Sequence, residues 1–395
     1  MNSDPGNDPA LPKQPLLAPL PLLRRRDRFD SYEQAARIAR RRLPRSIYSE
    51  LVGAPDRAVT LQANVAAFDE VLFRPRAAVA TAGRTISTTV LGVPISLPVL
   101  IAPVGGLRIV HPDGAPAAVA AAGDAGTIAA VSGSAGHPIA DIASVASGPL
   151  WQQFYISRGR ERAEILIAQA KERGCAALVV TVDAAVQGNR RPALRINLRN
   201  AFEFAPELIL RPGWTRRFVR DGLQIQVAND AVGTASSDAR PKMTAEWSDF
   251  AWIRELWQGP LVVKGIVRPE DALRALDVGA DAVVVSNHGG LTLDGTVATL
   301  SVLPSIVAAI DGRAEVLVDG GVRQGTDVVK AIALGARAVL IGRAYVLGLA
   351  IAGKAGVRTV LENLRYEIDR TLGLLGLQSI ADVDRSCVDV TSTSR

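Results

Sequence analysis

Residues 315–343 read EVLVDGGVRQGTDVVKAIALGARAVLIGR. This stretch holds two apolar runs of strand length, at 315–321 and 337–343, with a helical pattern between them. A continuous apolar run is typical of a strand buried on both faces, and parallel strands need a crossover connection that is usually a helix. The stretch therefore predicts a βαβ unit within a parallel sheet.

The same alternation of apolar runs and Ala-rich helical patterns extends back to residue 98. Eight such runs occur, and a parallel sheet built from eight βα units closes into an α/β fold of the (β/α)₈ or TIM barrel type. The predicted strands are 98–103, 127–132, 150–155, 176–183, 260–265, 281–287, 315–321 and 337–343.

The rest of the chain is arranged around this barrel. The composition of residues 1–28 predicts a disordered, Pro-rich leader. The barrel domain is expected to occupy residues 29–385 and to begin with a helical segment near Ser31. The interval between the fourth and fifth strands is long, and we interpret 184–259 as a lid insertion. Residues 386–395 are expected to form a C-terminal tail.

The composition excludes several classes of protein. The 395 residues are 48% hydrophobic and 21% charged, a globular balance, and no apolar run has the ~20 residues of a membrane helix. Two cysteines, Cys175 and Cys387, are too few for a disulfide framework or a zinc site, so we expect a cytoplasmic protein without a metal. The net charge of +6 is concentrated in short Arg-rich runs that are typical of solvated surface, so no nucleic-acid partner is expected.

Polar residues gather where the predicted strands end. In a (β/α)₈ barrel the active site lies at the C-terminal ends of the strands, because the eight following loops converge there. The residues at or after the eight strand ends are Pro103, Val104 and Gly105; Ser132; Gln153 and Tyr155; Thr181 and Asp183; Lys264; Ser286 and His288; Asp319, Gly320 and Gly321; and Gly342 and Arg343. This convergence predicts one site at that mouth of the barrel.

The last two strand ends indicate a phosphate site. Glycines with Arg323 and Arg343 follow strands seven and eight, where backbone N–H groups at a helix start and guanidinium groups can hold a dianion. The alternative is that the glycines only form tight turns between strand and helix.

Two further strand ends carry groups suited to redox chemistry. Lys264 is the only charge in an apolar strand; it would either pair with a buried carboxylate or stabilise negative charge on an electron-accepting cofactor. His288 could act as a base, with Asp183 as the carboxylate that fixes its tautomer. Isolated histidines are more often structural, but the strand end and the flanking glycines favour a catalytic role.

These motifs together resemble a known family. LPVLIAP (97–103), WQQFY (151–155), LVVKGI (261–266) and SNHGG (286–290), with the 315–343 stretch, resemble the FMN-dependent 2-hydroxy acid oxidases and dehydrogenases. The resemblance covers about residues 30–385 and implies an enzyme with an FMN cofactor and a homotetrameric assembly.

The resemblance also implies roles for the site residues. His288 would remove a substrate proton, from carbon or from the hydroxyl, Asp183 would orient it, and Tyr155 would lie beside the substrate. Lys264 would face the flavin edge that becomes negative on reduction, and Arg190 would approach a substrate carboxylate. The implied cofactor-binding residues are Pro103, Val104, Gly105, Ser132, Gln153, Thr181, Lys264, Ser286, Asp319, Gly320, Gly321, Arg323, Gly342 and Arg343.

Two positions depart from the family pattern at the substrate. The family usually has an arginine after Ser-Asn-His-Gly-Gly, and this chain has Leu291. The family usually has a second tyrosine shortly after the one that corresponds to Tyr48, and Glu50 occupies that position. Both departures remove groups that hold a carboxylate, which should weaken binding of a small 2-hydroxy acid by several kcal/mol.

Both departures make the chain resemble the pre-mycofactocin synthase subgroup, in which the usual arginine position is likewise not arginine. That resemblance implies oxidation of a C–OH or C–NH₂ carbon next to a carbonyl in a neutral or peptide-derived substrate. The alternatives are an ordinary L-2-hydroxy acid oxidase of the lactate, glycolate or mandelate type, and a non-catalytic flavin-binding partner protein. The sequence leaves the electron acceptor open among dioxygen, a quinone and a redox protein.

Overall fold

The structure is a computed structural model that describes residues 23, 27–186, 201–222 and 245–391. Most of the predicted leader, part of the predicted insertion and the substrate-binding candidate Arg190 lie outside the described residues.

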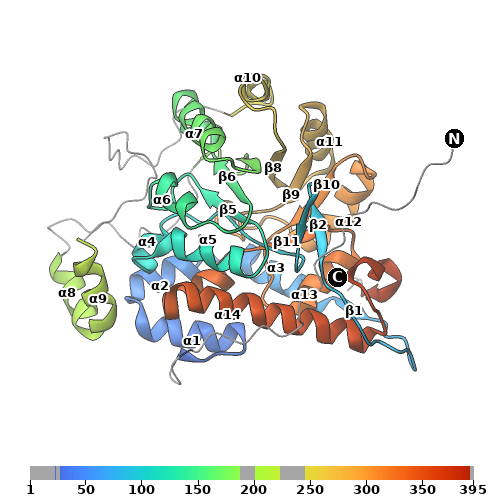
Figure 1. Ribbon diagram of the computed structural model, residues 1–395, viewed down its shortest axis with the longest axis horizontal. Helices are drawn as coiled ribbons and strands as arrows, with labels where there is room; N and C mark the ends of the chain where they lie inside the picture. The colour runs from blue at the N-terminus through green and yellow to red at the C-terminus, as the bar shows by residue number, and fades with distance from the viewer. Residues whose placement is uncertain (1–22, 24–26, 187–200, 223–244, 392–395) are drawn as a thin grey trace.

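The predicted barrel is confirmed. Eight parallel strands close in the order β10-β11-β4-β5-β6-β7-β8-β9, so each strand pairs with its sequence neighbours and β11 pairs with β4 (Figure 1). Each strand falls within one of the eight predicted runs, apart from the final residue of β8. The strands are β4 (Val99–Ile101), β5 (Ala129–Ser132), β6 (Leu150–Phe154), β7 (Ala177–Thr181), β8 (Leu261–Ile266), β9 (Ala282–Val285), β10 (Glu315–Val318) and β11 (Ala338–Ile341).

The strands are apolar throughout because both of their faces are covered. On β8, Val262 belongs to a cluster inside the barrel formed by the strands and residues next to them, whereas Leu261 and Val263 pack with the surrounding helices. The antiparallel hairpin of β2 (Thr88–Val90) and β3 (Val93–Ile95) adds two residues to the inner cluster. This hairpin therefore closes the barrel end opposite the strand C-termini.

Helices surround the barrel, as Figure 1 shows. A short helix α4 (Leu107–Val110) precedes α5, and the turn η2 (Ile156–Arg158) precedes α7. The helices that follow the eight strands are α5 (Gly114–Asp124), α6 (Ile139–Ser144), α7 (Arg160–Glu172), α10 (Asp249–Leu256), α11 (Pro269–Asp277), α12 (Thr299–Ile310), α13 (Gly325–Ala333) and α14 (Arg343–Leu375).

Helix α14 has the length and hydropathy of a membrane span, the one such helix among the described residues. Of its most apolar window, 78% is buried within the protein, where α14 packs against α5 and other helices. This burial is typical of a core helix.

The predicted N-terminal helical segment is confirmed as three helices, α1 (Tyr32–Arg42), α2 (Arg45–Val52) and α3 (Val59–Asp69). Ser31 caps α1 by accepting a hydrogen bond from the Gln34 N–H, and α1 packs on α14. After α3, strand β1 (Val71–Phe73) pairs with β12 (Val388–Val390), which follows the short turns η3 (Ile380–Asp382) and η4 (Arg385–Cys387). The segment that the sequence assigns to a tail therefore begins with paired residues.

The interval after β7 contains α8 (Ala201–Leu210), α9 (Pro212–Arg220) and α10. Helix α10 packs on α7 in the place of a regular barrel helix, while α8 and α9 lie beside α2 at the edge of the molecule (Figure 1). Arg108, on α4, makes two hydrogen bonds of 2.8 and 2.9 Å to Asp221, just after α9, and Trp214 Nε1 donates to the Ile109 carbonyl. These contacts fix α9 on the barrel, and the lid interpretation of the interval stays a prediction.

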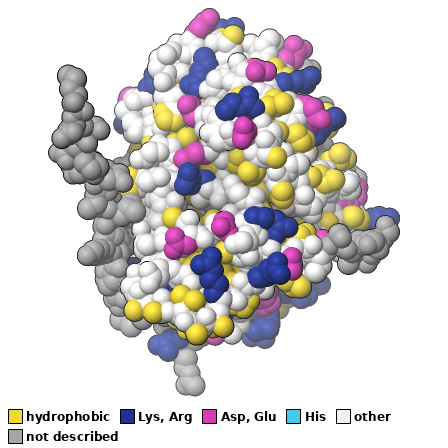
Figure 2. Space-filling model, turned by 90° about the vertical axis from the view of Figure 1, so that its right-hand side faces the viewer, with side chains coloured by type: hydrophobic (Ala, Val, Ile, Leu, Met, Phe, Trp, Pro, Cys, Tyr) yellow, Lys and Arg dark blue, Asp and Glu magenta, His cyan; other side chains and the backbone are white. Residues whose placement is uncertain are grey.

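The molecular face in Figure 2 carries charges of both signs. Lys and Arg side chains lie among Asp and Glu side chains on this face and do not gather into one basic patch. A mixed pattern gives this face no continuous positive field for a polyanion.

Candidate functional site

Three predicted catalytic residues meet at the C-terminal mouth of the barrel. Tyr155 follows β6, Asp183 follows β7 and His288 follows β9. His288 Nδ1 lies 2.9 Å from Asp183 Oδ1, and its Nε2 lies 3.4 Å from the Tyr155 hydroxyl. An ionised carboxylate can only accept, so Nδ1 carries the proton of this bond. Nε2 is thereby left as the nitrogen that can take a proton from a bound molecule.

His288 lies in a sharp backbone turn that explains the two glycines behind it. Its φ is 58°, and Gly289 and Gly290 follow with φ of 62° and 75°. A Cβ on Gly289 would lie 2.9 Å from Arg343 Nη1, and one on Gly290 would lie 2.8 Å from the backbone nitrogen of Leu61. The glycines therefore let the His288 loop approach both neighbours, and the surrounding contacts hold His288 in a backbone region that non-glycine residues rarely adopt.

A pair of buried amides ties this loop to α3. Asn64 Nδ2 donates to Asn287 Oδ1 and Asn287 Nδ2 donates to Asn64 Oδ1, both at 2.8 Å. The same oxygens also accept from the Gly290 and Thr299 N–H groups, and Asn287 Nδ2 donates to the Val297 carbonyl. Buried polar groups are stable when they are satisfied in this way. The network fixes the residue that precedes His288.

A second contact joins the same loop to the start of α3. The helix has no side-chain N-cap of its own. Asp294, six residues after His288, accepts from the backbone N–H groups of Thr60 at 2.9 Å and of Arg57 at 3.0 Å. These hydrogen bonds lower the pKa of Asp294. The loop thus supplies the acceptor that the helix start lacks.

Lys264 is buried and paired. Its Nζ lies 2.9 Å from Asp319 Oδ2 and 2.8 Å from Ser286 Oγ, and its side chain is 5% exposed. The structure therefore supplies the buried carboxylate partner that the sequence left as an alternative. An ammonium group has three donors, so one is left over for a bound molecule at this mouth.

The charges of this group stabilise one another. Burial acts to raise the pKa of Asp183, but the charge and hydrogen bond of His288 and the charge of Lys264 lower it below the usual value. Burial acts to lower the pKa of Lys264, but the charges of Asp319 and Asp183 raise it above the usual value. Asp183 is therefore an anion and Lys264 a cation at neutral pH.

Three of the predicted site residues each have a buried acceptor atom with no hydrogen-bond partner within the described residues. They are Gln153 Oε1, Asp183 Oδ2 and Asp319 Oδ1. Gln153 is held by its amide nitrogen, which donates to Thr181 Oγ1 at 2.9 Å. A buried acceptor without a partner costs about 1–3 kcal/mol, so these positions suit a ligand with N–H and O–H donors. The ring imide and the ribityl hydroxyls of FMN are such donors.

The loops after β4 and β5 contact each other at the same mouth. The Ser132 hydroxyl accepts from the Ser134 N–H at 3.2 Å, and the carbonyl of Ser134 accepts from the N–H of the residue after Gly105. Val104, which follows Pro103, lies across from Gly342, with its Cγ2 3.8 Å from where a Gly342 Cβ would stand. The predicted cofactor residues from the first and last strands are thus neighbours.

The predicted phosphate site after β10 has the expected glycine turn, but the N–H groups at the following helix start are already hydrogen-bonded. Gly320 and Gly321 have φ of 93° and 91°, and a Cβ on either would meet α3. At the start of α13, Asp327 Oδ2 already accepts from the Arg323 and Gln324 N–H groups. These main-chain donors are therefore not available to a phosphate.

Arg343 has a structural task that the sequence did not indicate. Its guanidinium donates to the carbonyls of Leu51 at 3.2 Å, Gly53 at 2.9 Å and Gly289 at 2.8 Å. The side chain thus joins the end of α2 to the His288 loop. A phosphate bound here would have to share the Arg343 guanidinium with these three carbonyls.

The substrate-side candidates lie on α2 and on the His288 loop. Leu291 follows Gly290 directly and is half-buried, Tyr48 is half-buried on α2, and Glu50 is exposed near the end of that helix. Arg190, the fourth candidate, lies outside the described residues.

Several residues at the site were not singled out by the sequence. Asn287 lies inside the SNHGG motif, which is a signal that could have found it, but its partner Asn64 lies 223 residues away on a helix. Arg158 stacks over the Tyr155 ring at 5.1 Å and donates to Ser134 Oγ at 2.9 Å, a fold-back that spacing cannot show.

Comparisons with known proteins agree with this geometry. The sequence profile of the family described as FMN-dependent dehydrogenase matches residues 39–390. The chain is 41% identical over 371 residues to the pre-mycofactocin synthase of Mycobacterium tuberculosis, covering 90% of this chain and 93% of that protein. It is 41% identical over 362 residues to the L-lactate oxidase of Nostoc sp., covering 90% of this chain and 96% of that protein.

A solved structure supports the same relationship. The crystal structure of the monotopic membrane protein (S)-mandelate dehydrogenase superimposes with a TM-score of 0.86 at 34% identity, covering 92% of this chain and 99% of that one. The family match spans the whole barrel, and the orphaned acceptors suit the FMN cofactor of that family. The chain is an enzyme of the FMN-dependent dehydrogenase family, to which the 2-hydroxy acid oxidases and dehydrogenases belong.

Proposed function

We propose that this enzyme oxidises a C–OH or C–NH₂ carbon next to a neutral carbonyl, such as an amide or lactam in a peptide-derived molecule. The observation that carries the proposal is Leu291, an apolar residue directly behind the His288 turn where the family usually has an arginine. A carboxylate buried there without a cationic partner would be costly, whereas an amide carbonyl would not.

The residues of the site can perform the proton transfer in either substrate class. His288 Nε2 takes the proton, and the imidazolium that forms lies against the ionised Asp183. Tyr155, 3.4 Å from Nε2, lies where it can contact the oxygen or nitrogen on the reacting carbon. FMN, when bound, accepts the two electrons released from that carbon. Lys264 places a positive charge at the cofactor end of the site.

Similarity to the pre-mycofactocin synthase of Mycobacterium tuberculosis supports the neutral substrate, because that relative matches along 90% of this chain. Similarity to the L-lactate oxidase of Nostoc sp. favours the alternative, an ordinary 2-hydroxy acid oxidase that would bind its carboxylate through Arg190 or another arginine of the predicted lid. A non-catalytic flavin-binding protein is the third possibility. His288, Asp183 and Lys264 argue against it, since a scaffold needs none of them.

Matched pairs of substrates test the proposal. Mandelate and 2-hydroxy-phenylacetamide, or lactate and lactamide, differ only in whether the carbonyl group is charged. We expect the neutral member of each pair to bleach the flavin under anaerobic conditions with a rate at least ~10-fold higher. This factor corresponds to a cost of ~1.4 kcal/mol for burying the carboxylate of the charged member without a partner. Rapid bleaching by lactate, glycolate or mandelate would contradict the neutral-substrate reading. A yellow protein that stays oxidised with every candidate and with sulfite would support the scaffold.

A variant at Leu291 tests the same point from the protein side. Leu291→Arg should raise kcat/KM for 2-hydroxy acids by roughly 10- to 100-fold, since a charge-assisted hydrogen bond contributes ~1.5–3 kcal/mol. Leu291→Met, which keeps the apolar character, is the matched control. No gain from the arginine would show that this side chain does not face the substrate.

The homotetramer and the cytoplasmic location are proposals that rest on the family resemblance and the cysteine count. Light scattering on the eluting protein tests the first, and cell fractionation tests the second.

A further inference from the structure

A small cavity lies beside the predicted phosphate end of the site. It has a volume of about 120 Å³ and is formed by the start of α1, the end of α3, the start of α13 and Glu367 on α14. Four carboxylates line it, from Glu33, Asp69, Asp327 and Glu367, and Arg323 supplies the one cationic side chain of its lining. The cavity is therefore strongly acidic around a single guanidinium.

The main-chain donors at the start of α13 are already taken up by two of these carboxylates. Asp327 accepts from the N–H groups of Arg323 and Gln324, and Glu367 accepts from that of Gly325 at 2.5 Å. A phosphate at this strand end therefore depends on the Arg323 side chain more than on the helix start.

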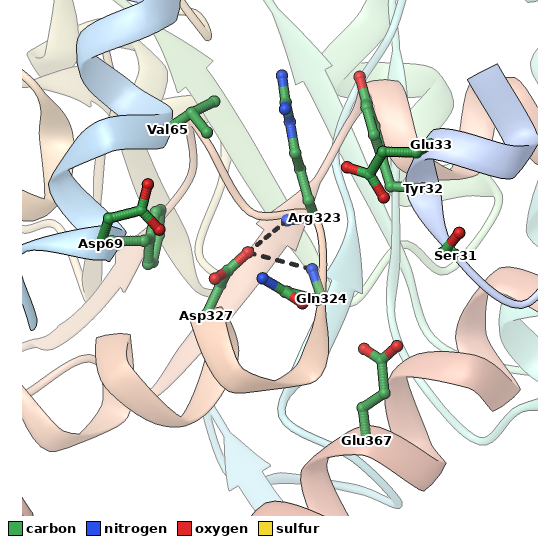
Figure 3. A pocket seen from close by; sticks show the side chains of 10 residues that line it. Ser31, Tyr32, Glu33, Val65, Asp69, Arg323, Gln324, Asp327 and Glu367 are labelled. Carbon is green, nitrogen blue, oxygen red and sulfur yellow. Dashed lines mark hydrogen bonds between the residues drawn. The ribbon is translucent and has the colours of Figure 1, made fainter. Parts of the chain in front are cut away.

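Arg323 forms no ion pair within the described residues, although four carboxylates line the same cavity. Its guanidinium instead lies over the ring of Tyr32, 4.6 Å from the ring centroid. Figure 3 shows Arg323 standing between Tyr32 on one side and Val65 and Asp69 on the other. A cation over an aromatic face is attracted to the ring and keeps its N–H edge free for an anion.

We propose that Tyr32 is a positioning residue for the cofactor: its ring holds the Arg323 guanidinium away from the surrounding carboxylates and ready for the FMN phosphate. Tyr32 is the first residue of α1, and the Ser31 cap fixes that end of the helix. The helix in front of the barrel thereby completes the phosphate site.

The electrostatics of Tyr32 agree with this placement. Burial raises the pKa of its hydroxyl, and the positive charges of Arg323 and Arg343 act in the opposite direction. Both arginines of the predicted phosphate end therefore lie within electrostatic reach of this one side chain.

The test measures FMN affinity, by titrating the apoprotein with FMN and following flavin fluorescence, and FMN release from the holoenzyme. Tyr32→Leu should weaken FMN binding roughly 5- to 30-fold, the range of a partly desolvated cation–π contact. Tyr32→Phe, which keeps the ring, should bind within ~2-fold of wild type. Tyr366→Leu, at an exposed Tyr–Arg pair on α14, is the control and should change nothing.

A double-mutant cycle separates positioning from a general structural role. In an Arg323→Gln background, Tyr32→Leu should cause less than a ~2-fold further loss, because the group it positions is gone. If Tyr32→Leu fails to fold, Tyr32→Met keeps apolar bulk without a ring face and takes its place in the cycle. Wild-type affinity of the ringless variant, an equal loss in both backgrounds, or an equal loss in Tyr32→Phe would each overturn the proposal.

Discussion

Removing the charge of Asp183 should slow flavin reduction without disturbing the fold of the site. Asp183→Asn keeps the shape of the side chain, and its amide oxygen can still accept from His288 Nδ1 across the 2.9 Å bond. What is lost is the attraction between a carboxylate and the imidazolium formed when Nε2 takes a proton. At an effective dielectric of ~20, two unit charges ~4 Å apart attract by ~4 kcal/mol. If most of the imidazolium charge has formed in the transition state, losing this attraction should slow flavin reduction by roughly 10²- to 10³-fold.

The assay is anaerobic stopped-flow reduction of the bound flavin at saturating substrate. FMN content is measured in parallel and the rate is expressed per bound flavin, because Asp183 Oδ2 is one of the orphaned acceptors that suit the cofactor. Asp369→Asn, which removes a carboxylate charge from the remote pair with Arg84, is the matched control and should reduce at the wild-type rate. If Asp183→Asn reduces within ~3-fold of wild type, the carboxylate does not stabilise a charged His288, and the catalytic assignment of the pair is wrong.

Three predictions concern stability. Gly321→Ala would place a Cβ against the backbone of α3 at a φ of 91°, and should lower the free energy of unfolding in urea by at least ~2 kcal/mol. Gly83→Ala is the control: its φ is 73° and the space around it is open, so the loss should be only ~1 kcal/mol. Arg365→Met leaves Glu362 buried without its 3.1 Å partner, so unfolding should become easier by about 3–5 kcal/mol, and a double variant with Glu362→Leu should regain part of the loss. The pKa of Lys264 is raised in the folded protein, so its charge stabilises the fold fully below pH 10.5, and this stabilisation is lost as the pH rises through the folded-state pKa. The urea midpoint should therefore fall more between ~pH 9 and ~pH 12 in wild type than in Lys264→Met. Equal falls in the two proteins would contradict the pairing of Lys264 with Asp319.

The barrel was predictable from the sequence because each strand is buried on both faces. The run at 281–287 has no polar alternation, and only a covered parallel strand tolerates that pattern. Placing polar residues at strand ends was then enough to bring Asp183 and His288 together, although 105 residues separate them. Parallel strands end on the same side of the barrel, so the contact follows from topology.

The remaining contacts depend on side-chain directions that topology does not determine. Arg343 follows a strand end, as predicted, but its guanidinium turns to three carbonyls because α2 ends beside it. Lys264 was recognised as unusual, yet its pairing with Asp319 required the register between non-adjacent strands. Asn64 lies on a helix outside the barrel, and no spacing in the chain connects it with Asn287.

The reciprocal amide pair has a consequence for the order in which the protein matures. Asn64 is synthesised 223 residues before Asn287, a delay of roughly 10–45 s at ~5–20 residues per second on the ribosome. During that interval α3 lacks its hydrogen-bond partner, because Asn287 and the turn that holds His288 have not yet been synthesised. The predicted cofactor residues extend to Arg343, so the cofactor site is assembled only late in translation, and an amino-terminal truncation that removed this helix would leave Asn287 without its partner.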